Sequence, residues 1–242
     1  MVTLSGPPGF DLDRVARSHA GAGLRPHAYD GRRLTTVLPR DTLARVDESL
    51  RVELSAHDPV GLQVLRRVLD LDADLTELWA LAPRWVRAAG AGRQLRAASV
   101  LEALAQALAG TNTSYRGTQA MMEQLVGDGP FPRPDQVLGR PLTAWGYRAP
   151  ALLGAARAVD EGLDQDWPDA SDEQVLTAVR GLRGFGPFAA ACVLPLIGRP
   201  RPLVLDSWLA QQVPDPGRYA RYGRWGGTVL WLEVTRTWFP DG

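Results

Sequence analysis

The sequence predicts a mainly α-helical protein preceded by a small α+β domain whose sheet is antiparallel. Two short apolar stretches near the start, residues 34–38 and 50–56, have the composition or the alternation of β-strands. From Asp58-Pro59 onward, apolar residues recur at helical spacing, and this pair suits a helix start because aspartate caps it and proline fits the first turn. We therefore assign residues 1–75 to the α+β domain and residues 76–242 to the helical domain.

Capping residues indicate where several helices begin. Ser99 and Glu102 have the spacing of a capping box, in which each side chain bonds an amide of the first turn, and they open an alanine-rich helix that ends near residue 109. Ser171 and Gln174 have the same spacing and open a helix that ends at a glycine turn. The other predicted helices cover residues 10–19, 60–69, 75–81, 114–126, 151–161, 187–197 and 228–238.

The composition excludes several classes of site. The single cysteine, Cys192, excludes internal disulfides and a four-thiolate iron–sulfur cluster, and its apolar helix favours a buried small side chain. The three histidines, His19, His27 and His57, lack the spacing of a metal site. All 27 basic residues are arginine, so no lysine can form a Schiff base with a sugar aldehyde. Without a signal peptide or a run of about 18 apolar residues, we expect a cytoplasmic protein that does not enter membranes.

The distribution of charge matters more than its sum. The formal net charge is zero, which by itself argues against binding to nucleic acid. Residues 180–242, however, contain eight arginines against four acidic residues. We expect contact with phosphates in this segment.

The most informative motif is a glycine turn followed at a distance by a carboxylate. Gly184-Phe185-Gly186 leads into an apolar helix, and glycines at a helix start let backbone N–H groups approach an anion such as a phosphate. Asp206 follows Phe188 by eighteen residues, after a β-branched run. This arrangement indicates an enzyme that processes DNA. The plainer interpretation is a helix C-cap at the glycines and a simple N-cap at Asp206.

A helix, a Gly-x-Gly hairpin, a second helix and the following aspartate resemble the helix-hairpin-helix DNA glycosylase superfamily, closest to its bacterial 3-methyladenine DNA glycosylase II branch. The hairpin motif covers about residues 172–198. Further similar segments are Gly31–Asp74, Ala109–Ser114, Gly146–Ala149 and Tyr219–Trp225. The resemblance implies the glycosylase fold, with the N-terminal sheet domain in front of it, and a monomer that acts on double-stranded DNA.

The resemblance also implies which groups meet the DNA backbone. The hairpin amides at Gly184 and Gly186 should hold a phosphate near the lesion. The carbonyls near Arg180, Leu182 and Phe185 should cradle a Na⁺ or K⁺ ion, the only cofactor expected. Additional phosphate contacts are expected from Arg148, Arg183 and Arg224.

Asp206 is the predicted catalytic residue. Cleavage of an N-glycosidic bond builds positive charge on the sugar, and a nearby carboxylate stabilises that charge. Phe188 stands where bifunctional members of the family have their lysine nucleophile, so a monofunctional enzyme is implied, in which water attacks. The Phe188 ring is expected to stack on the extruded base or to pack in the core.

Two further sets of residues complete the predicted site. Asn112, with Thr111 and Thr113, is expected to fill the gap left by the flipped nucleotide, although a solvated loop would look the same. The polarity of these three side chains is more similar to the 8-oxoguanine branch of the family. The rest of the resemblance points to enzymes that act on alkylated bases. Candidate walls of the base pocket, each of which could be core instead, are Trp145, Tyr147, Trp208 and Trp225.

The sequence thus predicts a monofunctional DNA glycosylase that hydrolyses the glycosidic bond of a flipped-out damaged purine, an alkylated one, in base excision repair. It would be associated with the nucleoid when bound to DNA and would need no redox or organic cofactor. Two alternatives stay open. The protein is a glycosylase for oxidised or mismatched bases, or it binds damaged DNA without excising a base.

Overall fold

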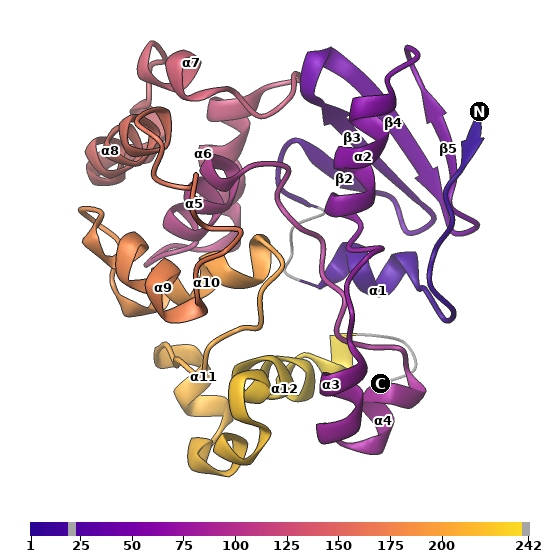
Figure 1. The fold of residues 1–242 in the computed structure, drawn as a ribbon. Helices are drawn as coiled ribbons and strands as arrows, with labels where there is room; N and C mark the ends of the chain where they lie inside the picture. Colours follow the sequence, from indigo (N-terminus) through magenta and orange to yellow (C-terminus); the bar gives the residue numbers. More distant parts are fainter. Residues whose placement is uncertain (19–22, 239–242) are drawn as a thin grey trace.

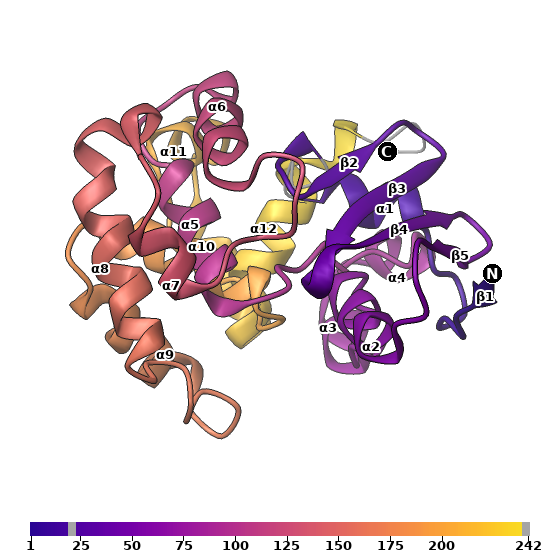
Figure 2. The same cartoon turned by 90° about the horizontal axis from the view of Figure 1, so that it is seen from above.

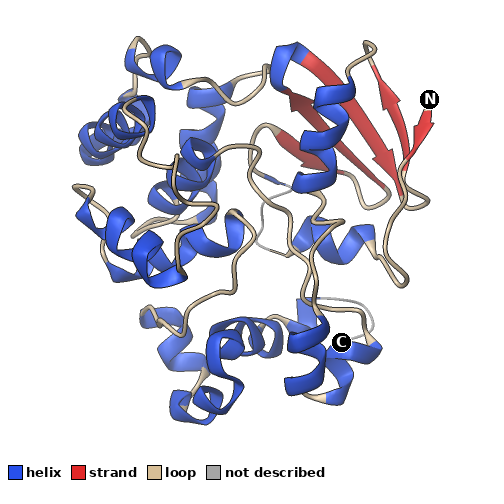
Figure 3. Ribbon diagram, in the orientation of Figure 1, coloured by secondary structure: helices blue, strands red, loops and turns tan. Residues whose placement is uncertain are grey.

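The computed structural model describes residues 1–18 and 23–238, and it places an antiparallel sheet beside a larger helical body (Figure 1). Figure 3 shows that all strands belong to the N-terminal part and that helices make up the rest. The predicted fold class is therefore confirmed. No helix within the described ranges is both long enough and apolar enough to span a bilayer.

The sheet has five strands in the order β1-β5-β4-β3-β2, all antiparallel. The strands are β1 (Val2–Thr3), β2 (His27–Tyr29), β3 (Arg33–Leu38), β4 (Thr42–Asp47) and β5 (Arg51–Leu54). Only β3 and β5 were predicted. Strand β4 buries Thr42, Ala44 and Val46 on one face, and these small or polar side chains give a weak apolar alternation.

Two helices cover the buried face of the sheet. These are α1 (Leu12–Arg17) and α2 (Pro59–Val68), and Asp58 caps α2 as predicted by accepting a hydrogen bond from the Gly61 N–H at 2.9 Å. Leu12 and Leu65 pack with Leu34 and Val46 of the sheet in one apolar cluster. The predicted helix over residues 10–19 is α1, and its expected end at His19 lies outside the described residues.

The helical body contains two further apolar clusters. Its helices are α3 (Thr76–Leu81), α4 (Arg84–Ala88), α5 (Val100–Ala109), α6 (Tyr115–Val126), α7 (Pro134–Leu138), α8 (Ala149–Asp160), α9 (Asp172–Gly181), α10 (Pro187–Leu196), α11 (Ser207–Gln212) and α12 (Gly226–Val234), with 3₁₀ segments at Thr143–Arg148, Pro216–Trp225 and Arg236–Trp238. One cluster surrounds α5, which packs against α6, α8 and α10. The other joins α3 and α4 to α11 and α12. Figure 2 shows the sheet and α8 at opposite ends of the molecule.

Helix α5 is the centre of the helical body. Nine of its ten residues are buried, and its alanines allow neighbouring helices to approach closely on several sides. Ser99 caps the helix as predicted, through a hydrogen bond from the Glu102 N–H at 3.2 Å. The Glu102 carboxylate, however, accepts its bond from the Ala98 N–H at 2.9 Å and not from Ser99, so the predicted capping box is only half formed.

The predicted glycine hairpin joins α9 to α10. Both halves of the capping box at the start of α9 are present, because Ser171 and Gln174 exchange hydrogen bonds of 3.2 and 2.8 Å. Gly184 has φ +91°, a conformation that side chains other than glycine's rarely adopt. A Cβ atom at this position would also lie 2.7 Å from the Cβ of Ala151 in α8. The hairpin therefore requires glycine at position 184 for two reasons.

We expect Gly184→Ala to lower the free energy of unfolding by about 1–3 kcal/mol, because it combines backbone strain with a clash against α8. Denaturant titration measures the change. Gly181→Ala is the matched control, since Gly181 ends α9 with open space around it, and alanine there should be neutral or stabilising. Equal stability of Gly184→Ala and the wild-type protein would contradict the described hairpin conformation.

Candidate active site

Two adjoining cavities lie between α5, the hairpin and the C-terminal helices. The first has a volume of about 520 Å³ and a largely apolar lining. The second has a volume of about 550 Å³ and reaches the hairpin glycines. Both cavities are lined by Gly110, Thr113, Phe188, Asp206 and Trp208. The predicted catalytic carboxylate therefore stands where the two cavities meet.

The backbone at the start of α11 fixes the Asp206 carboxylate. Asp206 is the N-cap of this helix, and its Oδ1 accepts a hydrogen bond of 2.7 Å from the Leu209 N–H. The residue is half-buried and lines both cavities. Asp206 is therefore both a helix cap and a carboxylate in the cavity lining. The cap removes the rotational freedom of the side chain without closing it off from the cavities.

Phe188 also combines two roles that the sequence left open. Its position in the first turn of α10 places it in the lining of both cavities. It also packs, partly buried, against the cluster that joins α3 and α4 to α11 and α12. The ring is thus held in place by the core while it borders the first cavity.

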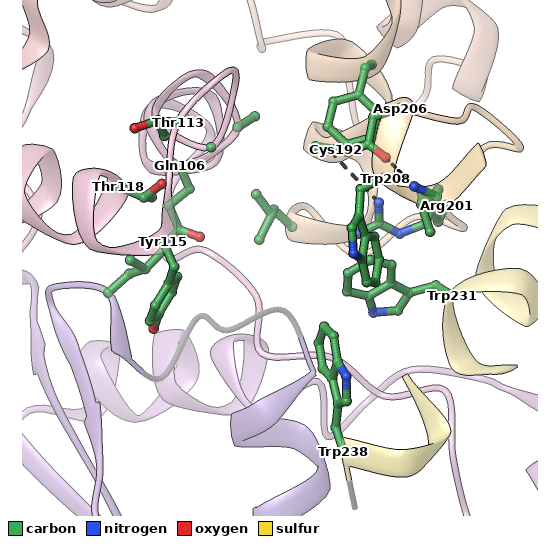
Figure 4. Close-up of a pocket in the computed structure, with 16 residues that line it drawn as sticks. Gln106, Thr113, Tyr115, Thr118, Cys192, Arg201, Asp206, Trp208, Trp231 and Trp238 are labelled. Carbon is green, nitrogen blue, oxygen red and sulfur yellow. Dashed lines mark hydrogen bonds between the residues drawn. The ribbon is translucent and has the colours of Figure 1, made fainter. Parts of the chain in front are cut away.

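Three tryptophans form one wall of the first cavity, and Figure 4 shows them together. The rings of Trp208 and Trp238 are 6.3 Å apart and tilted by 40°, and Trp231 meets Trp238 edge to face at 5.7 Å. The guanidinium of Arg201 lies over the Trp231 ring at 4.5 Å. Of these residues only Trp208 was predicted. Trp231 and Trp238 reach the cavity because α12 lies in the same cluster as α11 and the 3₁₀ segment follows α12, a tertiary arrangement that the sequence does not reveal.

Cys192 lies on the same cavity wall, one helical turn after Phe188. Arg201 Nη1 is 3.9 Å from the Cys192 Sγ. Burial raises the pKa of the Cys192 thiol, Arg201 opposes this rise, and the charge of Asp206 adds to it. The thiol therefore stays protonated at neutral pH and is a poor nucleophile. Cys192 was predicted as a buried small side chain, whereas the structure leaves it partly exposed in the cavity lining.

The opposite wall comes from α5, α6 and the loop between them. It carries Gln106, Thr113, Tyr115 and Thr118, which Figure 4 shows across the cavity from Asp206 and Trp208. The amide nitrogen of Gln106 donates a hydrogen bond of 3.0 Å to Glu102 Oε1. The sequence analysis predicted only Thr113 here. The one available signal was the helical spacing of Gln106, one turn after Glu102.

The predicted wedge residues form the loop between α5 and α6. Asn112 has φ +44°, which asparagine tolerates better than most residues. Thr111 Oγ1 donates to the Leu108 carbonyl at 2.7 Å, and Arg148 Nη2 donates to the carbonyls of Thr111 and Asn112, the latter at 3.1 Å. Arg148 is buried and stacks on Tyr147, and it donates to the loop while also lining the second cavity beside Gly184 and Gly186, so its predicted phosphate contact stays a prediction.

The hairpin borders the second cavity. Gly184 and Gly186 are exposed and line it, and Gly186 begins α10 without a side-chain cap. Arg183 is exposed beside them. The Leu182 carbonyl accepts a 3.1 Å hydrogen bond from the Phe185 N–H, which leaves it one further lone pair. This spare acceptor is compatible with the predicted monovalent cation.

Three predicted residues lie elsewhere. Trp145 is completely buried and donates to the Met121 carbonyl at 3.0 Å, so it belongs to the core and does not line either cavity. Trp225 and Arg224 both bond Glu77, at 2.8 and 3.1 Å, and are absent from both linings. Tyr147 is 72% exposed and lines only the second cavity. Bulky aromatic residues pack in cores as readily as in pockets, and the sequence could not separate these cases.

Among the described residues, no group of three or more histidine, cysteine, aspartate or glutamate side chains could hold a metal ion. The residues gathered at the site supply a fixed carboxylate, a largely apolar cavity with aromatic walls, and the exposed hairpin glycines.

No protein-family model and no curated protein matches this sequence. Solved structures do match its fold. The chain is similar to MBOgg1 in complex with a low-affinity DNA ligand, with a TM-score of 0.74 and 18% identity over 96% of this chain and 94% of that one. It is similar to the 3-methyladenine DNA glycosylase from Archaeoglobus fulgidus, with a TM-score of 0.70 and 17% identity over 99% of both chains.

The 8-oxoguanine glycosylase/lyase of Clostridium acetobutylicum matches with a TM-score of 0.73 and 14% identity over 93% of both chains. At such low identities the matches establish a common architecture and leave the activity to be argued from the site. They extend over the sheet domain as well as the helical body. The chain has the fold of the helix-hairpin-helix DNA glycosylases.

Proposed function

We propose that the protein is a monofunctional DNA glycosylase that hydrolyses the N-glycosidic bond of a damaged purine turned out of the duplex. One observation carries the proposal: a carboxylate fixed by a helix cap stands where an aromatic cavity meets a hairpin groove. The cavity of about 520 Å³ falls within the range of roughly 300–1,000 Å³ that is typical of ligand pockets. Fold similarity supports the proposal but does not decide it.

The proposed binding mode uses both cavities. The exposed backbone at Gly184 and Gly186, with Arg183 beside it, would hold a phosphate of the damaged strand. A cation on the Leu182 and Phe185 carbonyls would add positive charge near that phosphate. The extruded base would then enter the first cavity against Trp208 and Phe188, and the Asn112 loop would lie toward the vacated stack.

In the proposed reaction, the bond between the sugar C1′ and the base nitrogen breaks, and its electron pair leaves with the base. The Asp206 carboxylate stabilises the positive charge that develops on the sugar, and it accepts a proton from the water whose oxygen bonds C1′. The product is an abasic site. Phenylalanine at position 188 and the absence of lysine from the chain support hydrolysis over lyase chemistry.

Alkylated purines are the proposed substrates. The tryptophan wall and Phe188 offer π faces, which attract an electron-poor alkylated ring. A cationic base also leaves without much help from an acid. Oxidised bases are the second candidate, because the loop at Thr111, Asn112 and Thr113 is polar and two matched structures are 8-oxoguanine glycosylase/lyases. Duplexes bearing single defined lesions separate the two.

Asp206→Asn is expected to slow base release by about 100- to 1,000-fold, because it removes the charge that stabilises the oxocarbenium character of the sugar. Asparagine caps helices well, so the variant should keep the thermal stability of the wild-type protein. The rate is measured under single-turnover conditions, with alkali cleavage revealing abasic sites.

Asp215→Asn is the matched control, since Asp215 also caps a helical segment but lines neither cavity. A wild-type rate for Asp206→Asn would refute the catalytic assignment. Salt-sensitive binding of damaged DNA without base release by the wild-type protein would instead support the non-catalytic alternative.

Borohydride should trap no covalent adduct between the protein and lesion-bearing DNA, because the reaction passes through no Schiff base. Gel electrophoresis of the borohydride-treated reaction, beside a known lyase as positive control, checks this. A slow-migrating protein–DNA species in the sample would contradict the monofunctional mechanism.

A further inference from the structure

Gln106 is a polar side chain in an otherwise largely apolar cavity. It is 8% exposed and lines the first cavity from helix α5. Figure 4 shows it with Thr113 and Thr118 on the wall across from Asp206 and Trp208. A base whose sugar lies beside Asp206 would therefore point its far edge toward Gln106.

The orientation of the Gln106 amide is set by a buried carboxylate. Gln106 Nε2 donates to Glu102 Oε1 at 3.0 Å, and Glu102 has no exposed surface. Both Glu102 oxygens accept hydrogen bonds in this arrangement, so the amide presents its NH₂ group to Oε1 and its carbonyl oxygen points the other way. Within the described part of the chain, the Gln106 carbonyl oxygen accepts no hydrogen bond.

The sheet domain helps to hold this carboxylate. Glu102 Oε2 accepts from the Ala98 N–H at 2.9 Å, and His27 Nε2 of strand β2 lies 3.2 Å from Oε1. His27 Nδ1 in turn is 2.9 Å from Thr36 Oγ1 of strand β3. Glu102 Oε2 is thus hydrogen-bonded, whereas His27 Nε2 is a buried nitrogen that lies close to Oε1 and forms no hydrogen bond among the described residues. A chain of contacts therefore runs from the sheet, through His27 and Glu102, to Gln106 in the cavity.

We infer that Gln106 determines specificity by accepting hydrogen bonds from the extruded base, and that this base is a damaged guanine. The inference rests on the proposed glycosylase function. The edge of guanine opposite the glycosidic bond carries two adjacent donors, N1–H and the 2-amino group, and a carbonyl oxygen has two lone pairs to accept them. Adenine offers an acceptor at N1, which would face the Gln106 oxygen unfavourably.

Glu102 is therefore a positioning residue. It does not touch the base but keeps the Gln106 oxygen directed at it, and His27 packs against it from the sheet. Because N7-methylguanine and 8-oxoguanine share the N1–H and 2-amino donors, the inference holds for either class of lesion.

The test compares pairs of duplexes that differ only in the 2-amino group. One pair carries N7-methylguanine or N7-methylhypoxanthine, and the other carries 8-oxoguanine or 8-oxohypoxanthine. For whichever guanine lesion the wild-type protein excises, we expect kcat/KM to fall roughly three- to tenfold when the amino group is absent. Gln106→Met, which keeps the volume but removes the acceptor, should bring the ratio within a pair close to one.

Glu102→Gln should also reduce this ratio. A glutamine at position 102 has an NH₂ group that can donate to the Gln106 carbonyl oxygen, so the Gln106 amide is free to turn around and present its NH₂ group to the base. A merely structural role of Glu102 would lower both members of a pair equally. Gln212→Met is the matched control, because Gln212 is exposed at the end of α11 and lines neither cavity.

A ratio near one in wild-type protein, or a ratio unchanged by Gln106→Met, would overturn the inference. Excision of adenine lesions but of neither guanine lesion would overturn it as well while leaving the glycosylase function intact. Only the absence of base release from every lesion would refute the glycosylase function itself.

Discussion

The proposed chemistry depends on one hydrogen bond, from the Leu209 N–H to the Asp206 carboxylate. The bond orients the side chain at the end of the irregular segment that precedes α11. A helix start needs such an acceptor in any case, and the N-terminal dipole of the helix favours a negative charge there. The same contact that begins α11 thus holds the Asp206 carboxylate at the junction of two cavities.

Helix α10 connects the other parts of the site to this carboxylate. Its N-terminus carries the hairpin glycines, its first turn carries Phe188, and its next turn carries Cys192. The groups proposed to meet the phosphate and the base thus lie on or beside α10, which packs against α5, and Asp206 borders the same cavities from the N-terminus of α11. Helix α5 carries Gln106 on the facing wall and is itself buried on almost every side. In the proposed binding mode, these helices would set the distance between the sugar and the far edge of the base.

Local signals in the sequence were sufficient for the glycine turn and for capped helix starts such as that of Ser171 with Gln174, which lie within a few positions of one another. Asp206 was singled out through its distance from the hairpin and the family resemblance, and the structure places it in the lining of both cavities. Contacts between distant segments could not be read in this way. Trp231 reaches the cavity because α12 packs beside α11, and Trp145 leaves it because its ring fills the core next to Met121. Strand β4 was missed because its buried face is made of threonine, alanine and valine. The role of Gln106 depends on a carboxylate whose expected bond to Ser99 goes to Ala98 instead.

The central claim is that the carboxylate at position 206 faces a sugar on which positive charge develops. The most direct measurement is the affinity for two duplexes with a base-free site, one carrying a cationic pyrrolidine and the other its neutral tetrahydrofuran counterpart. We expect the wild-type protein to bind the cationic duplex more tightly, since the pyrrolidine resembles the charged transition state, and we expect Asp206→Asn to lose that preference. Equal affinities of the wild-type protein for both duplexes would contradict the central claim.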